Sequence, residues 1–265
     1  MKTIGFIGVG NMGGALATAV CGVVDPQHVY VSDVPEKAAQ FAAKTGCRMA
    51  DNAHIATACD CVFLGVKPQG LPALLEELRP AIAANRQMLL VSMAAGVPLC
   101  KIETLAGEVP VIRIMPNLPV KAGEGLILYA ANRMVSDAQK AAFCSLLTAA
   151  GQLDELAEEL MDAASAISGC GPAFVSMFAD ALASGGAACG LPREKALQYA
   201  LQTLIGTARL LQVDDWTPAE LTRAVCSPKG STIEGVEALR AADFEKIAAS
   251  AVKASYIRTK ELGKS

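Results

Sequence analysis

The first part of the chain alternates between short, continuously apolar segments and longer segments in which apolar residues recur with helical spacing. Parallel strands are buried on both faces and are apolar throughout, whereas a surface helix keeps one polar face. The pattern predicts strands at residues 3–8, 29–32, 61–66, 88–92, 109–115 and 125–129. It predicts helices at residues 12–24, 35–45, 71–84, 98–105 and 136–149. This alternation predicts an α/β domain with a mostly parallel, doubly wound sheet.

The strand pattern stops after about residue 156, and the rest of the chain is predicted to be all-α. Helices are expected at residues 158–167, 172–189, 192–212, 218–224 and 231–260. The segment 172–189 carries one charge, Asp180, and is apolar almost all round. Because a helical half of this size offers little core, we expect a second subunit to bury this helix. The sequence therefore predicts two domains, residues 1–156 and residues 157–265.

The composition of the chain limits which partners, metal sites and membrane segments are expected. The chain is 52% hydrophobic and only 18% charged, and its net charge of −3 gives no reason to expect nucleic acid or an anionic membrane surface as a partner. Its nine cysteines are odd in number and lack metal-ligand spacing, which predicts no metal site and a reducing, cytoplasmic location. Glycines interrupt the apolar N-terminal segment, so neither a signal peptide nor a membrane span is predicted there.

A glycine-rich segment follows the first predicted strand and opens the first predicted helix. Its residues are Gly8, Val9, Gly10, Asn11, Met12 and Gly13. Glycines at this spacing permit a tight turn, a close backbone approach to a pyrophosphate, and close packing of helix on strand. Because the motif stands between a strand and a helix, it predicts a dinucleotide site that uses Gly8, Gly10, Asn11, Met12 and Gly13.

The end of the second predicted strand bears on the choice between NAD(H) and NADP(H). Asp33 lies 20 residues beyond Gly13, where an acidic residue binds the ribose hydroxyls and favours NAD(H). Ser32, with Lys37 one turn later, would instead suit the 2′-phosphate of NADP(H). Asp33 also stands where it would cap the helix that begins at Pro35. The sequence leaves all three interpretations open: an NAD(H) site, an NADP(H) site and a helix cap.

Three more strand ends are candidates for cofactor contacts, because ligands bind at the carboxyl ends of parallel strands. Lys67 would lie near the ribose or the phosphates, or would be a solvated loop lysine, and Asn117 would line the nicotinamide pocket. The candidate residues at these ends are Val66, Lys67, Pro68, Ala94, Ala95, Gly96 and Asn117.

A turn of small residues runs into a helix in the second half, at residues 226–232. Helix starts leave backbone N–H groups unpaired and carry partial positive charge, so they bind anions such as carboxylates. Pro228, Gly230, Ser231 and Thr232 would let a small ligand approach this backbone. The competing interpretation is an ordinary Ser or Thr helix cap.

Taken together, these segments resemble the pyrroline-5-carboxylate reductase family. The matching segments are residues 6–13, 66–68, 94–97, 115–117, 168–174, 180–182, 190–193 and 226–232. The resemblance implies an N-terminal Rossmann-like domain and an all-α dimerisation domain that forms homodimers and larger assemblies of dimers. It also implies NAD(P)H-dependent reduction of 1-pyrroline-5-carboxylate to L-proline, the last step of proline biosynthesis.

The resemblance assigns roles in the second turn. Lys229, Gly230, Ser231 and Thr232 are expected to hold the substrate, with backbone N–H groups on its carboxylate and the Thr232 hydroxyl on the ring nitrogen. Two positions depart from the family, which commonly has Ser in place of Cys170 and a small residue in place of Lys229.

Two other classes of function are alternatives for this sequence. A 3-hydroxyacid dehydrogenase or another imine reductase of the same plan would be a rival enzyme, but the former carries a catalytic lysine on the long helix, and residues 172–189 contain none. The other rival is a non-catalytic nucleotide sensor, which would not need residues 168–174 or Thr232. A lone carboxylate on an apolar helix is usually hydrogen-bonded within the fold, so Asp180 is expected to be structural.

Overall fold

The structure is a computed structural model that describes residues 1–262. The chain divides into two compact units, which are described separately below. The first contains Met1–Gly169 and the described chain from Tyr256 onward, and the second contains Cys170–Ser255. An α/β region followed by an all-helical region confirms the predicted fold class. The functional boundary between residues 156 and 157 stays a prediction.

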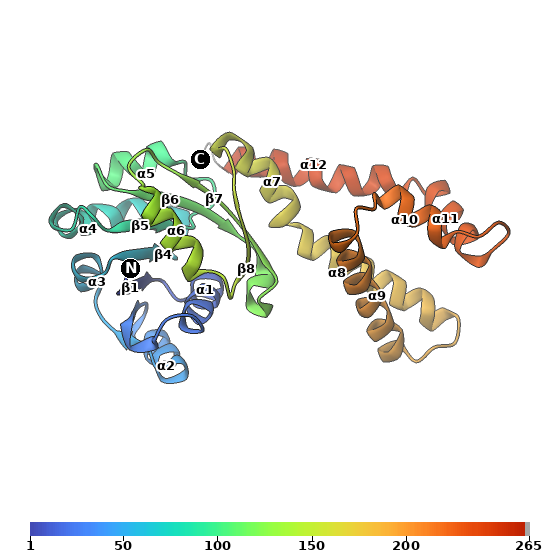
Figure 1. The fold of residues 1–265 in the computed structure, drawn as a ribbon, viewed down its shortest axis with the longest axis horizontal. Helices are drawn as coiled ribbons and strands as arrows, with labels where there is room; N and C mark the ends of the chain where they lie inside the picture. The colour runs from blue at the N-terminus through green and yellow to red at the C-terminus, as the bar shows by residue number, and fades with distance from the viewer. Residues whose placement is uncertain (263–265) are drawn as a thin grey trace. The chain divides into compact units, whose positions relative to one another are not determined.

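The first unit is built on one eight-stranded sheet with the strand order β3-β2-β1-β4-β5-β6-β7-β8 (Figure 1). Neighbouring strands are parallel except for the antiparallel pair β6 and β7. The strands are β1 (Ile4–Ile7), β2 (Val29–Ser32), β3 (Arg48–Met49), β4 (Cys61–Leu64), β5 (Leu89–Ser92), β6 (Val111–Pro116), β7 (Gly125–Ala131) and β8 (Gly151–Glu155). The order reverses between β1 and β4, and the cofactors of such sheets bind at that point.

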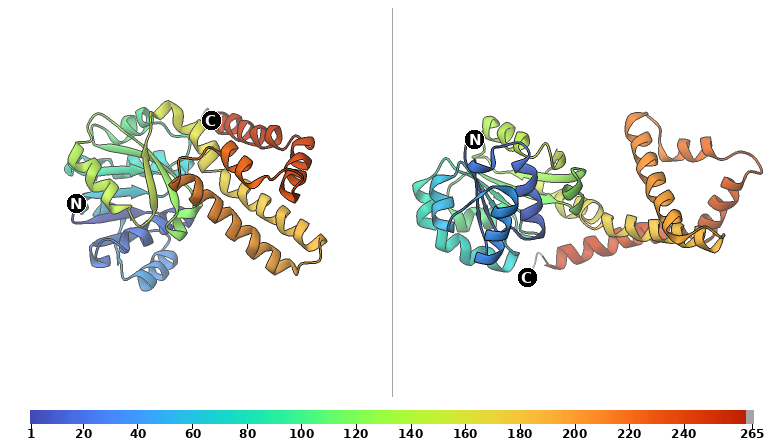
Figure 2. Two further views of the ribbon diagram at one scale, coloured as in Figure 1. Left: turned by 45° about the vertical axis from the view of Figure 1, so that its right-hand side comes forward. Right: turned by 90° about the horizontal axis from the view of Figure 1, so that it is seen from below.

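Helices cover both faces of this sheet, as the continuously apolar strands predict (Figure 2). Alternate strand residues point to opposite sides: Phe6 and Phe63 belong to one core, whereas Ile7 and Leu64 belong to the other. The first core is covered by α1 (Asn11–Cys21), α2 (Pro35–Thr45) and α6 (Asp137–Leu146). The second is covered by α3 (Asn52–Ala58), α4 (Leu71–Ala84), α5 (Leu99–Ala106) and α7 (Met161–Ser168).

The second unit is helical. Its elements are α8 (Gly171–Ala188), α9 (Arg193–Val213), α10 (Pro218–Val225), α11 (Ser231–Ala241) and the first part of α12 (Phe244–Leu262). The prediction of one helix over residues 231–260 was wrong, because α11 ends at Ala241 and α12 begins at Phe244. Asp243 adopts a left-handed conformation, with φ of 54°, which an α-helix cannot continue through.

The helices of the second unit leave much apolar surface exposed. Only Ala179 and Ala183 of α8 are buried, and Met177 is 73% exposed. By length and composition alone, the helical stretch Glu158–Ala188 could cross a membrane, but such a signal is weak. Buried core helices and subunit interfaces have the same composition, and the stretch is divided into α7 and α8 near Gly169. Exposed apolar surface of this kind is typical of a site that binds another protein surface.

Candidate active site

The glycine-rich loop between β1 and α1 fits its motif for steric reasons. Gly8 has a φ of 98°, and a Cβ there would lie 2.7 Å from the carbonyl carbon of Gly65. A Cβ on Gly13 would lie 2.1 Å from the carbonyl oxygen of Gly8. A Cβ on Gly10, by contrast, would meet no atom within 4 Å. Gly8 and Gly13 therefore make the turn possible, while Gly10 leaves an open space above it.

The first turn of α1 presents its backbone N–H groups without a side-chain cap. Gly10 is the N-cap in an extended conformation, and Asn11 and Met12 follow in the first turn. A helix start of this kind at the carboxyl end of a parallel strand is suited to bind a pyrophosphate. The geometry thus fits the cofactor role predicted for Gly10, Asn11 and Met12.

Asp33 holds this loop in place. One carboxylate oxygen accepts the N–H of Val9 at 2.9 Å, and the other accepts the N–H of Val34 at 2.7 Å. The predicted alternative, in which Asp33 caps α2, was wrong: the N-cap is Val34 and no side chain caps that helix. The neighbouring Ser32 donates its hydroxyl proton to the Asn52 side-chain oxygen at 2.7 Å.

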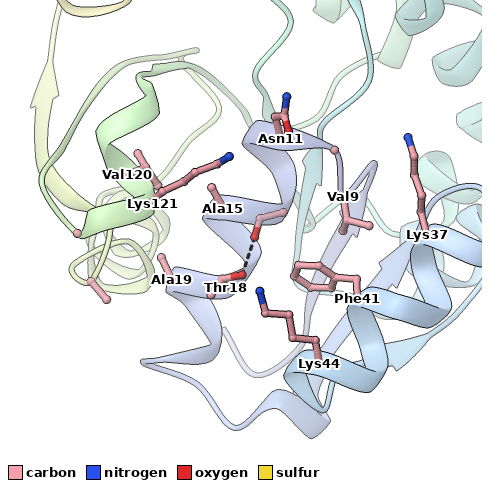
Figure 3. A pocket seen from close by; sticks show the side chains of 14 residues that line it. Val9, Asn11, Ala15, Thr18, Ala19, Lys37, Phe41, Lys44, Val120 and Lys121 are labelled. Carbon is pink, nitrogen blue, oxygen red and sulfur yellow. Dashed lines mark hydrogen bonds between the residues drawn. The ribbon is translucent and has the colours of Figure 1, made fainter. Parts of the chain in front are cut away.

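A groove of about 760 Å³ runs from this helix start along the outer face of α1. Its floor is made of small side chains such as Ala15 and Thr18, and α2 and the short helix η3 (Leu118–Ala122) form its sides (Figure 3). Lys37 and Lys44 extend from α2, and Lys121 extends from η3. No carboxylate lines the groove, and none of these lysines forms an ion pair with the described residues. The groove is therefore cationic and suited to phosphates.

The other predicted cofactor residues lie at the same edge of the sheet, because β1, β4 and β5 are parallel. They occupy the loops that follow β4 and β5: Val66, Lys67, Pro68, Ala94, Ala95 and Gly96. Lys67 is exposed, and Gly96 has a φ of 74° that favours glycine. Ala94 is buried, and its N–H faces the Ser92 hydroxyl at 3.4 Å.

Asn117 has a structural role that the sequence did not reveal. Its side-chain NH₂ donates to the Ser168 carbonyl at 3.0 Å, and its side-chain oxygen accepts the Leu126 N–H at 2.8 Å. The side chain is 9% exposed. Asn117 thus ties the end of β6 to β7 and to the end of α7, so its polar atoms are already engaged.

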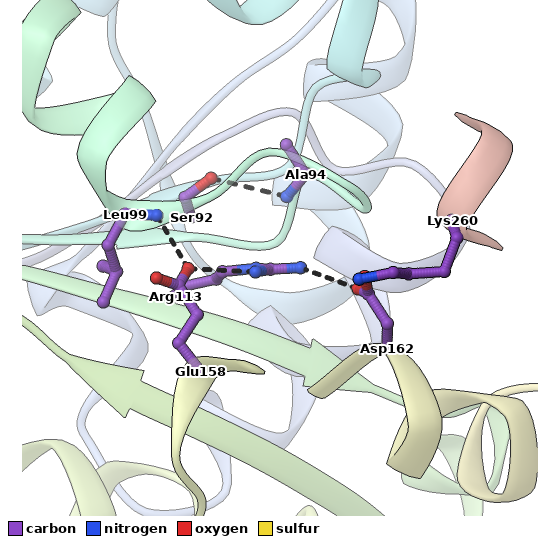
Figure 4. Close-up of polar contacts among 7 residues, drawn as sticks. All are labelled: Ser92, Ala94, Leu99, Arg113, Glu158, Asp162 and Lys260. Atoms are coloured by element: carbon purple, nitrogen blue, oxygen red, sulfur yellow. Dashed lines mark hydrogen bonds and ion pairs between the residues drawn. The ribbon is translucent and has the colours of Figure 1, made fainter. Parts of the chain in front are cut away.

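A partly buried ion-pair network around Arg113 anchors α7 and the C-terminal end of α12 to the sheet (Figure 4). The Arg113 guanidinium, 8% exposed, contacts Glu158 at 2.9 Å and Asp162 at 3.5 Å. Lys260 approaches the other oxygen of Asp162 at 3.8 Å, and Glu158 also accepts the Leu99 N–H at 2.7 Å. The pairing offsets the cost of burying the arginine. It fixes the segment that leads into the helical region.

The second candidate site is the turn before α11. The Gly230 N–H donates to the Ser227 carbonyl at 3.0 Å and closes a four-residue turn. Pro228 and Lys229 are its central residues, and Lys229 has a φ of 60°. This is the arrangement of a type II turn, in which proline is favoured at the first central position and glycine at the second. Lys229 therefore carries a conformation that a glycine would adopt without strain.

Gly230 is the N-cap of α11, and no side chain caps this helix either. The competing interpretation of an ordinary Ser or Thr cap is thus wrong. Ser231 and Thr232 form the exposed first turn, and neither hydroxyl has a hydrogen-bond partner among the described residues. Because the Gly230 N–H is used within the turn, the first-turn N–H groups of Ser231, Thr232 and Ile233 are left for an anion.

The predicted residues thus fall into two groups. Those from Gly8 to Asn117 lie in the first unit, and Lys229 to Thr232 lie in the second. Sequence reasoning did not find Lys44 or Lys121, which belong to no motif and meet only because α2 and η3 flank α1. It also missed the buried pairing of Arg113.

An uncapped glycine-initiated helix at the reversal point of a parallel sheet, beside a cationic groove, is the arrangement of a dinucleotide-binding protein. Residues 3–96 match the family model described as NADP oxidoreductase, coenzyme F420-dependent. Residues 158–262 match the model described as pyrroline-5-carboxylate reductase dimerisation. The chain belongs to the pyrroline-5-carboxylate reductase family.

Similar proteins support this membership over the whole chain. A pyrroline-5-carboxylate reductase of a Synechocystis species is 38% identical, with 98% of both chains covered. The solved structure of the Coxiella burnetii pyrroline-5-carboxylate reductase has a TM-score of 0.90 at 30% identity, covering 98% of each chain. The Plasmodium falciparum pyrroline carboxylate reductase, solved with NADP bound, has a TM-score of 0.87 at 29% identity, covering 99% of this chain and 98% of that one.

Proposed function

We propose that this chain is an NADPH-dependent reductase that converts 1-pyrroline-5-carboxylate to L-proline in proline biosynthesis. The observation that carries the proposal is the full-length similarity to pyrroline-5-carboxylate reductases, joined to two uncapped, glycine-initiated helix starts. One such start suits a pyrophosphate and the other suits a carboxylate.

The residues of the first unit fit a dinucleotide. The open space above Gly10 gives room for a pyrophosphate close to the backbone, and the N–H groups of Asn11, Met12 and Gly13 would bind it. Gly8, Val66, Pro68 and the segment from Ala94 to Gly96 would form the surrounding wall. NADPH, when bound, supplies the hydride that reduces the imine carbon.

The polar groups near β2 favour NADP(H) over NAD(H). Both carboxylate oxygens of Asp33 already accept backbone N–H groups, so this side chain is committed to the loop. Lys37 and Lys44, which have no ion-pair partner within residues 1–262, offer positive charge along the same side of the groove. Since a 2′-phosphate is an additional dianion, we assign its binding to Lys37; the Ser32 hydroxyl would contribute only by giving up its hydrogen bond to Asn52. Lys67 would contact the phosphates or the ribose.

The substrate would be held at the start of α11. The N–H groups of Ser231 and Thr232 would donate to its carboxylate, and the positive end of the helix would stabilise the negative charge. Gly230 lets the chain turn tightly there, since a Cβ would lie 2.3 Å from the Ser227 hydroxyl. Lys229, an exposed central residue of the turn, would add attraction for the carboxylate.

The residue types in the second unit indicate how the ring nitrogen of the substrate would obtain its proton. The Thr232 hydroxyl would hydrogen-bond the ring nitrogen and orient the imine carbon. A threonine hydroxyl is a weak acid, so it would relay a proton that comes from water. The only histidines, His28 and His54, belong to the first unit. An imine nitrogen is basic enough to be protonated without a histidine, whereas reduction of a carbonyl would need an acid.

Residues 157–265 would act as the dimerisation and substrate-binding domain, and residues 1–156 as the dinucleotide-binding domain. A second copy of the chain would cover the exposed apolar side chains of α8 and α9, among them Met177 and Ile205. The match of residues 158–262 to a dimerisation model supports this assignment. We place the enzyme in a reducing compartment, the cytoplasm, because its nine cysteines are free thiols.

The direct assay follows absorbance at the nicotinamide band after mixing the protein with 1-pyrroline-5-carboxylate and NADPH, and then NADH. The proposal predicts turnover with both and a higher kcat/KM with NADPH. Absence of turnover with either cofactor, in protein shown to be folded, would contradict the proposed reaction. A preference for NADH would contradict only the assignment of Lys37.

A further inference from the structure

Two cysteine sulfurs in the first unit are in direct contact although they lie 26 positions apart in the sequence. Cys21 Sγ and Cys47 Sγ are separated by 3.2 Å and share a hydrogen bond. Cys21 is the last residue of α1, and Cys47 follows α2 after the single residue Gly46. No other pair of sulfurs among the described residues has such a contact. The pair brings together two thiols that no predicted function uses.

The surroundings of the pair allow the sulfurs to move closer. A disulfide needs an S–S distance of about 2.05 Å, so the sulfurs must approach by about 1.2 Å. Gly22 follows Cys21 and Gly46 precedes Cys47, which gives both backbones freedom to adjust. Cys21 is the last residue of α1, and Cys47 lies in the short connection between α2 and β3, so neither residue is itself paired in the sheet.

The shared hydrogen bond makes one of the two thiols reactive. The contact with Cys21 and, to a smaller extent, the Thr45 side chain lower the pKa of the Cys47 thiol to about 7, against the opposing effect of burial. The same bond raises the pKa of Cys21. The lowered pKa favours the thiolate of Cys47, and the thiolate is the form that reacts with oxidants. Burial raises the pKa of Cys59 and Cys61, so these thiols stay protonated.

We propose that Cys21 and Cys47 form a redox-active dithiol site that a small hydroperoxide converts into an intramolecular disulfide. The Cys47 thiolate attacks the peroxide, so that an S–O bond forms, the O–O bond breaks and hydroxide leaves. The Cys21 sulfur then attacks the Cys47 sulfenic acid, an S–S bond forms, and water leaves with the remaining thiol proton. With hydrogen peroxide, two electrons and two hydrogens pass from the thiols to give two waters. A thiol reductant reverses the change.

The consequence is a covalent link between the ends of the two helices that carry part of the cationic groove. Thr18 and Ala19 of α1 and Phe41 and Lys44 of α2 line that groove. Because the bond closes a loop of about 26 residues, it restricts the unfolded chain, and we expect it to raise the Tm of the first unit by roughly 5 °C or more. Cys47 is only 7% exposed, so the site favours a small peroxide over a protein oxidant.

The test treats the full chain with hydrogen peroxide, alkylates the remaining thiols and maps the cysteines by mass spectrometry. We expect a peptide that links Cys21 to Cys47, a fall in free thiols from nine to seven, migration as a monomer on a non-reducing denaturing gel, and reversal by dithiothreitol. In Cys21→Ser, dimedone should label Cys47, because the sulfenic acid has no resolving thiol. Cys100→Ser, which removes an exposed thiol without a sulfur neighbour, should form the bond as the wild type does.

Two results would overturn the proposal. One is recovery of both Cys21 and Cys47 in alkylated form, to the same extent as Cys100, after peroxide treatment. The other is a disulfide that joins either residue to a different cysteine or to a second chain. Neither readout depends on the reductase activity, so failure here and failure of the proposed function are distinguishable.

Discussion

The starts of α1 and α11 share one design but differ in how firmly it is built. Both helices begin at an uncapped glycine in an extended conformation, Gly10 in one and Gly230 in the other. The first is held by packing, since Gly8 and Gly13 touch neighbouring backbone and Asp33 anchors the loop. The second is an exposed turn. The proposed cofactor cradle is thus preformed by packing against the sheet, while the proposed carboxylate cradle depends on its own short turn.

The strongest test of this contrast replaces glycines in the first loop. Gly13→Ala should lower the free energy of unfolding by about 2 kcal/mol or more and abolish tight NADPH binding, because the Cβ would clash with the Gly8 carbonyl oxygen. Thermal unfolding and a fluorescence titration with NADPH measure the two effects. Gly10→Ala is the matched control: its Tm should be unchanged, while NADPH binding should weaken roughly tenfold as the methyl fills the open space. Normal NADPH binding by Gly10→Ala would place the pyrophosphate elsewhere.

The corresponding test of the second helix start removes a hydroxyl. Thr232→Ala should lower kcat at least tenfold, which is about 1.4 kcal/mol of barrier, with little change in Tm, because Thr232 is exposed and its hydroxyl has no hydrogen-bond partner among the described residues. Steady-state kinetics with 1-pyrroline-5-carboxylate measure it. Thr232→Ser should restore most of the rate. If the alanine variant keeps the wild-type kcat, the hydroxyl does not meet the ring nitrogen.

Removing one positive charge from the groove should have an effect of intermediate size on the KM for NADPH. Lys37→Ala should raise the KM for NADPH about fivefold to tenfold and leave the KM for NADH nearly unchanged, because only NADPH carries the 2′-phosphate. Lys101→Ala, on α5 and outside the groove, is the matched control and should alter neither constant. Equal changes in both constants would assign Lys37 to a phosphate common to the two cofactors.

The smallest effect concerns the strained turn. Lys229→Gly should raise the free energy of unfolding of the helical unit by up to about 1 kcal/mol, because glycine adopts the left-handed conformation without strain. It should also raise the KM for 1-pyrroline-5-carboxylate if the ammonium group attracts the carboxylate. Denaturant unfolding and kinetics separate the two. An unaltered KM would show that Lys229 points into solvent and influences only the turn.

Much of the architecture was predictable because buried parallel strands are apolar throughout. The strands that were missed lack this signal: β3 has two exposed residues, and β8 is a partly exposed strand at the edge of the sheet. The break at Asp243 was missed because a left-handed aspartate leaves no mark in a hydrophobic pattern.

The residues of the candidate sites also divide into those that the sequence predicts and those that it does not. Motifs predicted the glycine loop and the turn before α11, because their chemistry depends on adjacent residues. The gathering of Lys37, Lys44 and Lys121 around one groove depends on tertiary packing, and so does the commitment of Asn117 to Ser168. No local pattern in the sequence predicts the grouping of the three lysines or the hydrogen bond of Asn117 to Ser168.

The most direct test of the central claim follows the hydride itself. The protein is incubated with 1-pyrroline-5-carboxylate and NADPH that carries deuterium on the transferred position of C4, and the product is analysed by mass spectrometry and NMR. Direct reduction of the imine predicts L-proline with a single deuterium on the ring carbon next to nitrogen that does not bear the carboxylate. Unlabelled proline, deuterium at another position, or no proline would contradict the account.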